Sequence, residues 1–131
     1  MSRQPHPYLH GELVVVIDCA DLERAARFWT AVLGYTPTGG ADGVYRGLVP
    51  VSGSGIEVLL QRTADAKQGK NRVHLDLRTH DLQAEVSRVT ALGATMLTSS
   101  PITEDGATWH VLADPDGNEF CVLQPSHPIT P

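Results

Sequence analysis

The first half of the chain shows two kinds of hydrophobic pattern in succession. Residues 13–18 form an apolar, largely β-branched run, which predicts a buried strand. From Leu22 onward an apolar residue recurs every three or four positions, which predicts an amphipathic helix with Asp21 as N-cap and Gly34 as C-cap. Further strands are expected at 35–38, 44–49 and 56–61.

The pattern then starts again in the second half. Residues 72–77 alternate between apolar and polar side chains, as a half-buried strand does. A second helix is predicted to begin after Asp81 and to end at Gly93. Asp, Pro and Gly occupy the positions of 114–117 that favour a type I turn. Strands are expected at 95–98, 108–113 and 119–123.

Corresponding landmarks of the two halves lie at a nearly constant separation. This spacing indicates a duplicated unit of one strand, one helix and three strands. Two such units would cover one face of their sheets with helices, and the other faces would curve around a shared cavity. The landmark pairs are Asp21 and Asp81, Gly34 and Gly93, and Gly55 and Gly117, which are 60, 59 and 62 residues apart.

Strand alternation predicts which side chains of the second unit face that cavity. In its first strand, Val73, Leu75 and Leu77 are expected to pack under the helix. His74 and Asp76 then point the other way, toward the cavity.

The same rule applies to the last strand of each unit. Glu119, Cys121 and Leu123 are expected to face the cavity, because Phe120 and Val122 should face the helix. The repeat assigns the cavity face of the first unit to Val14, Val16, Glu57, Leu59 and Gln61.

One imidazole and two carboxylates are therefore predicted to converge, from His74, Glu57 and Glu119. Imidazole nitrogen and carboxylate oxygen are common ligands of Zn²⁺, Mn²⁺, Fe²⁺ and Ni²⁺. The pair Glu57 and Glu119 also suits catalytic proton transfer if burial keeps one of them neutral. A single histidine on a strand is equally compatible with an ordinary hydrogen-bonded residue.

Two further regions allow alternative interpretations. The register of 108–113 is ambiguous, so either Trp109 or His110 lines the cavity, and Trp109 is also compatible with core packing. Lys67 and Lys70 lie in the polar segment 62–71. They would either receive an anionic group at the pocket rim or belong to a solvated loop.

Composition narrows the class of protein. The chain has 131 residues, 41% of them hydrophobic, which fits one globular domain. A net charge of −5 without a basic stripe argues against a nucleic-acid partner, and the apolar runs are too short to span a membrane. The N-terminal residues lack the apolar centre of a signal peptide, so a cytoplasmic location is expected, with Cys19 and Cys121 as free thiols.

Three segments resemble the vicinal-oxygen-chelate superfamily, which includes glyoxalase I, extradiol dioxygenases and bleomycin-resistance proteins. The resemblance is strongest to its glyoxalase-like branch, and it covers about residues 12–124. The segments are Val16-Ile17-Asp18-Cys19-Ala20-Asp21 with Phe28-Trp29 and Leu33-Gly34, then 70–77, then Asp114-Pro115-Asp116-Gly117-Asn118-Glu119-Phe120.

This resemblance implies an α+β fold of two βαβββ modules. Their sheets would form a cupped, incomplete β-barrel with the helices outside. One domain is expected at 12–124, with modules at about 12–62 and 71–124 and tails at 1–11 and 125–131. Members of the superfamily commonly form homodimers, so a homodimer is expected as well.

The resemblance also implies where a divalent metal would be held. Metal-bearing members take ligands from the first and last strands of each module, which correspond here to Val14, Glu57, His74 and Glu119. Valine cannot bind a metal, so glyoxalase I and extradiol dioxygenase activities are not expected. Histidines 6 and 10 of the N-terminal tail are not expected to replace it.

Two functional hypotheses remain open. In the first, Glu57, His74 and Glu119 hold Zn, Ni, Mn or Fe in a lyase or isomerase, with Glu57 and Glu119 as the candidate catalytic carboxylates. In the second, the protein binds or sequesters a small molecule without a metal, as resistance proteins do. The pocket residues expected in either case are Val14, Val16, Leu59, Gln61, Asp76, Trp109 and Cys121.

Overall fold

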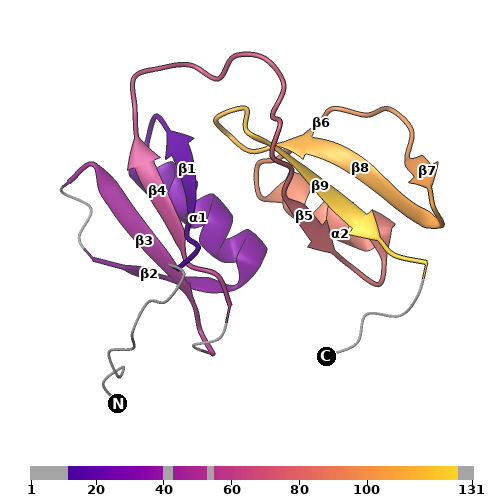
Figure 1. Cartoon of the computed structure of the whole chain (residues 1–131), viewed down its shortest axis with the longest axis horizontal. Coiled ribbons are helices and arrows are strands. Elements are labelled where there is room, and N and C mark those ends of the chain that lie inside the picture. The colour runs from indigo at the N-terminus through magenta and orange to yellow at the C-terminus, as the bar shows by residue number, and fades with distance from the viewer. Residues whose placement is uncertain (1–11, 40–42, 53–54, 127–131) are drawn as a thin grey trace.

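The computed structural model describes residues 12–39, 43–52 and 55–126 and contains two similar modules (Figure 1). The predicted tail 1–11, with its two histidines, lies outside the described residues, as do residues 127–131. The first module contains β1 (Val15–Cys19), α1 (Leu22–Leu33), β2 (Tyr35–Thr38), β3 (Tyr45–Pro50) and β4 (Val58–Arg62). The second contains β5 (Asp76–Arg78), α2 (Leu82–Ala91), β6 (Thr95–Met96), β7 (Ile102–Glu104), β8 (Ala107–Ala113) and β9 (Glu119–Gln124).

Both modules build their sheets in the same way. The first sheet has the order β1-β4-β3-β2, and the second has the order β5-β9-β8-β6, with β7 also paired to β8. In each module the first strand lies parallel to the last, and the other pairs are antiparallel. The helices pack outside the sheets, and the sheets do not close into a barrel. The predicted α+β fold of two βαβββ modules is therefore confirmed.

The predicted boundaries of α1 are confirmed by its caps. The Asp21 side chain accepts hydrogen bonds from the backbone N–H groups of Glu23 and Arg24, at 3.0 and 3.1 Å. At the other end Gly34 adopts a left-handed conformation with φ of 70°, which glycine reaches without steric cost. The buried stripe between the caps is Leu22, Ala25, Ala26, Phe28, Trp29 and Val32.

The strand expected at 72–77 is shorter than predicted. It begins only at Asp76, and Val73 is 77% exposed instead of packing under the helix. Pairing with β9 begins only at Leu75, whose carbonyl accepts a hydrogen bond from the backbone N–H of Cys121 at 2.8 Å. Leu75 and Leu77 do pack against the core, so the alternation holds once pairing has begun.

The two modules share one hydrophobic core. Phe28 and Trp29 of α1 contact Phe120 of β9, with ring centroids 6.2 and 5.3 Å apart. Helix α1 thus packs against both modules, although its sequence belongs to the first. Within the described residues, no helix has both the length and the hydrophobicity needed to cross a membrane.

Candidate functional site

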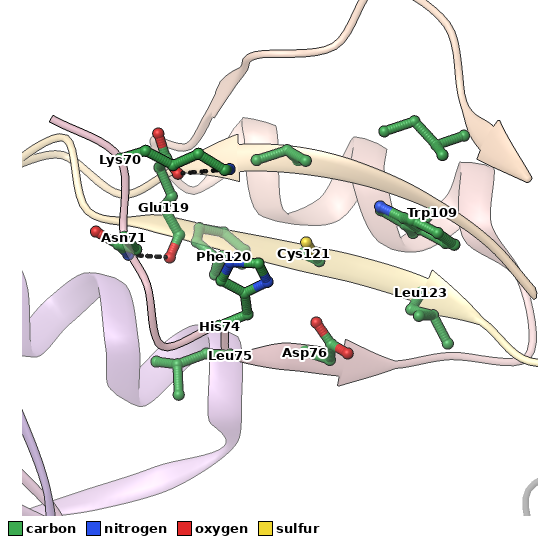
Figure 2. Close-up of a pocket in the computed structure, with 12 residues that line it drawn as sticks. Lys70, Asn71, His74, Leu75, Asp76, Trp109, Glu119, Phe120, Cys121 and Leu123 are labelled. Carbon is green, nitrogen blue, oxygen red and sulfur yellow. Dashed lines mark hydrogen bonds and ion pairs between the residues drawn. The ribbon is translucent and has the colours of Figure 1, made fainter. Parts of the chain in front are cut away.

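A cavity of about 300 Å³ lies against the second sheet (Figure 2). Its floor comes from β9, where the alternating residues Glu119, Cys121 and Leu123 all line it. The intervening Phe120 and Val122 are buried in the core. Strand β9 therefore separates the helix layer from the open face of the module.

One end of the cavity is polar. There the Nζ atom of Lys70 lies 3.4 Å from Oε1 of Glu119 and forms an ion pair with it. The side-chain amide of Asn71 donates to the backbone carbonyl of Glu119 at 3.1 Å. Lys70 and Asn71 come from the segment that links the two modules, so this linker forms part of the site (Figure 2).

The other end is apolar. Trp109 pairs with Leu123 across β8 and β9, and Ile102 of β7 pairs with Trp109 on its other side. All three residues line the cavity, together with Val111. The β8–β9 register also places His110 on the opposite face, where it is buried and its Nδ1 lies 2.8 Å from Oγ1 of Thr98.

Cys121 lies between these two ends, with Asp76 opposite it on β5. Burial raises the pKa of the Cys121 thiol, and the negative charge of Asp76 and a hydrogen bond with that carboxylate raise it further. The thiol therefore stays protonated near neutral pH. A protonated thiol is a poor nucleophile, so Cys121 contributes an uncharged, unreactive side chain to the lining of the cavity.

The turn before β9 holds Glu119 at the mouth of the cavity. The backbone N–H of Gly117 donates to the carbonyl of Asp114 at 2.9 Å, which closes the turn predicted from the sequence. Asp116 of this turn accepts hydrogen bonds from the backbone of Ala20 and from the guanidinium of Arg24, both at 2.8 Å. The start of β9 is thereby attached to the first module.

Comparison with known proteins identifies the family. The family model for the glyoxalase-like domain matches residues 14–123. The chain belongs to the glyoxalase-like domain family. A comparison with curated protein sequences gives no match.

Solved structures with the same fold include members of the glyoxalase, bleomycin-resistance and dioxygenase group. The fosfomycin resistance protein FosX from Mesorhizobium loti is 17% identical, with a TM-score of 0.66 over 88% of this chain and 92% of that one. A family enzyme from Burkholderia phytofirmans is 18% identical, with a TM-score of 0.68 over 85% and 95%. TioX from Micromonospora is 19% identical, with a TM-score of 0.62 over 87% and 98%. At these identities the likeness shows the shared fold.

The predicted site residues of this glyoxalase-like chain fall into two groups. The cavity brings together five of them: His74, Asp76, Trp109, Glu119 and Cys121. The others belong to the first module and do not line this cavity: Val14, Val16, Glu57, Leu59 and Gln61. Val16 instead lines a neighbouring hollow of about 320 Å³, which also touches Glu119.

The predicted metal ligands do not come together within one chain. In the described residues, no three His, Cys, Asp or Glu side chains are arranged to hold a metal ion. Glu57 lies just before β4, where its carbonyl accepts a hydrogen bond from Val15 of the first sheet, whereas His74 and Glu119 line the second. The ammonium group of Lys70 already neutralises Glu119. The donor set that the described residues of a single chain bring together therefore does not fit a metal ion.

Five lining residues were not predicted to face the cavity. Leu75 and Phe120 were expected to pack under the helices, and they line the cavity as well as contacting the core. Ile102 lies on β7, a strand whose residues are all exposed and therefore lack an alternating signal. Val111 lies two residues after Trp109, so alternation would have found it had the register of β8 been known. Asn71 carries no sequence signal, because its place depends on the path of the linker.

Proposed function

We propose that this glyoxalase-like protein binds a small organic molecule in the cavity of the second module and needs no metal ion to do so. The observation that carries the proposal is the cavity itself. Its volume lies at the lower end of the range of small-molecule sites. Apolar walls around Trp109 face a few polar groups at the other end, which is the usual composition of such sites.

Two further points support this function, and the first of them favours it over metal-dependent chemistry. The Lys70–Glu119 ion pair supplies the positive charge that a metal ion would otherwise bring to Glu119. One protein of the same fold, FosX, is named for resistance to the antibiotic fosfomycin. Binding or sequestration of a small toxic molecule is therefore the function proposed here.

A metal-dependent lyase or isomerase is the second candidate. It is favoured by His74 and Glu119, two competent ligands that line one cavity. Glu57 would then have to come from another chain, with Glu57 and Glu119 as the catalytic carboxylates. Zn, Ni, Mn or Fe would suit such ligands.

Metal analysis separates the two candidates. The protein is purified without chelators, and its content of Zn, Ni, Mn and Fe is measured beside that of His74→Ala and Glu119→Ala. Metal-free binding predicts well below one metal ion per chain in all three proteins. A stoichiometric metal in the parent that is lost from both variants would overturn the proposal and establish the second candidate.

We further propose a homodimer. Several apolar side chains on the first module and the linker are exposed, which favours their burial by a second copy. Light scattering at micromolar concentration tests this, and a monomeric mass would contradict it. These residues include Leu13, Val16, Val51 and Val73, whose exposed fractions are 71, 51, 76 and 77%.

We also propose a cytoplasmic location, which the free thiols of Cys19 and Cys121 support because disulfides are rare there.

A further inference from the structure

We infer that the ligand of this cavity is an organic cation, with its positive group beside Asp76 and an aromatic or apolar body against Trp109. This inference rests on the proposed function and specifies the chemical class of the molecule bound. It follows from the charges that line the cavity and from their positions along β9.

The two carboxylates of the cavity differ in their partners. Two carboxylates, Asp76 and Glu119, and one ammonium group, Lys70, line it. Lys70 forms its ion pair with Glu119, 3.4 Å away. Among the ion pairs of the described residues, none includes Asp76, and Arg78 two residues further along β5 does not line the cavity. The negative charge of Asp76 is therefore not compensated by an ion pair within the described residues.

The uncompensated carboxylate lies between the Lys70–Glu119 ion pair and the aromatic residue. Asp76 is opposite Cys121, and Trp109 is opposite Leu123, the next cavity-facing residue of β9. Figure 2 shows Asp76 below Cys121 and beside His74, with its carboxylate toward Leu123, whereas Lys70 and Glu119 lie together at the end away from Trp109. A molecule that lies along Leu123 therefore meets both groups at once.

Both groups favour positive charge. A carboxylate attracts a cation directly, and the face of an indole ring attracts it through its quadrupole. An anionic ligand would be repelled by Asp76, and it would reach Lys70 only by separating that ammonium group from Glu119.

A series of three probes of similar shape tests the inference. The probes are 2-(1-naphthyl)ethylamine, 2-(1-naphthyl)ethanol and 1-naphthaleneacetate, which are cationic, neutral and anionic at pH 7. Binding to the full chain is measured by calorimetry, and the indole N–H signal of Trp109 in an NMR spectrum reports the site. The second tryptophan, Trp29, is buried in the core and serves as the internal reference.

We expect the amine to bind about 5- to 10-fold more tightly than the alcohol, and the carboxylate to bind most weakly. Asp76→Asn, which keeps the shape of the side chain, should remove most of the preference for the amine over the alcohol, because only the weaker attraction of the Trp109 ring remains. Asp65→Asn is the matched control, because Asp65 is an exposed carboxylate that does not line this cavity. It should leave the amine preference intact.

The outcomes distinguish this inference from the proposed function. Equal binding of all three probes with a shifted Trp109 signal, or a preference for the carboxylate, would overturn the organic cation and leave small-molecule binding intact. An amine preference that Asp76→Asn leaves undiminished would also overturn the inference. No binding by any probe, with the Trp109 signal unmoved, would count against both.

Discussion

Asp114 is a charged residue with only 3% of its surface exposed, and its environment explains how it is tolerated. Its Oδ2 accepts hydrogen bonds from the indole N–H of Trp29 and from the side-chain amide of Asn118, both at 3.0 Å. Its Oδ1 accepts from the backbone N–H groups of Asp116 and Asn118 at 2.9 and 2.8 Å. Four donors satisfy this carboxylate, and one of them comes from the other module.

Replacing this carboxylate should therefore destabilise the protein. Asp114→Ala removes the acceptor for Trp29 and for the turn, so the free energy of unfolding should fall by about 3 kcal/mol. Urea denaturation measures it, with Asp65→Ala as the control at an exposed position. A loss as small as that of the control would show that Asp114 does not support the turn.

Cys19 predicts a dependence of stability on alkaline pH. Burial raises the pKa of its thiol from 9.0 to about 11, and the nearby charges of Asp116 and Asp114 act in the same direction. The unfolded chain loses this proton near pH 9, whereas the folded chain keeps it to about pH 11. The resulting stabilisation is therefore complete below pH 9 and is lost as the pH rises to about 11.

The free energy of unfolding should accordingly fall by about 2 kcal/mol more in the parent than in Cys19→Ala between pH 8.5 and pH 11. Comparing the two proteins cancels the titration of lysines and tyrosines. Urea denaturation across this pH range provides the measurement. Equal losses in the two proteins would exclude the buried thiol as the cause.

At the scale of elements, the helices were predicted well and β5 poorly. Both helices carry local signals, a capping aspartate and a spaced apolar stripe, which operate within one turn of the chain. Strand β5 has only three residues. Its pairing with β9 begins at the hydrogen bond between Leu75 and Cys121, which are 46 positions apart in sequence. No local pattern in 72–75 reports where that pairing begins, and Val73 was misplaced for this reason.

The C-terminus of α1 offers a test of its local signal. A side chain at Gly34 would meet no atom within 4 Å, so only the left-handed backbone opposes substitution. Gly34→Ala should cost about 1 kcal/mol, and Gly34→Asn should cost less because asparagine tolerates this conformation better. Thermal unfolding of both variants checks the order. An alanine variant as stable as the parent would contradict the capping role.

At the scale of the whole molecule, the contacts between modules lead us to propose that 12–124 folds as a single domain. Besides the aromatic contacts of α1 with Phe120, the guanidinium of Arg88 on α2 donates to the carbonyls of Ala31 and Val32 at the end of α1, at 3.0 and 2.8 Å. Glu85 holds that guanidinium in place through two hydrogen bonds of 2.8 and 2.7 Å. The end of α1 is therefore tied to both β9 and α2.

A single cooperative unfolding transition follows from this arrangement. Tryptophan fluorescence and far-UV circular dichroism should give the same urea midpoint, because neither module can lose its packing alone. Arg88→Met should lower the free energy of unfolding by about 1–2 kcal/mol while keeping one transition. Glu85→Gln, which keeps a hydrogen-bonding partner for Arg88, should lower it less. Separate midpoints for the two probes would show that the modules unfold independently.

The sequence by itself determined the duplicated βαβββ order, the helix caps and the turn at 114–117. These features depend on spacing and on local hydrogen bonding, which a single chain displays directly. Strand alternation, a local rule, also predicted that His74, Asp76, Glu119 and Cys121 face one cavity, whereas it left open whether Trp109 or His110 does so.

The tertiary structure decided how the two sheets lie relative to each other, and therefore which polar groups meet. Alternation indicates the face of a sheet but gives no distance between two sheets, so it could not separate Glu57 from His74 and Glu119. The partner of Glu119 proved to be Lys70, brought there by the path of the linker. These two residues are 49 positions apart in sequence, and their pairing leaves Asp76 as the carboxylate of the cavity that has no ion-pair partner in the described part of the chain.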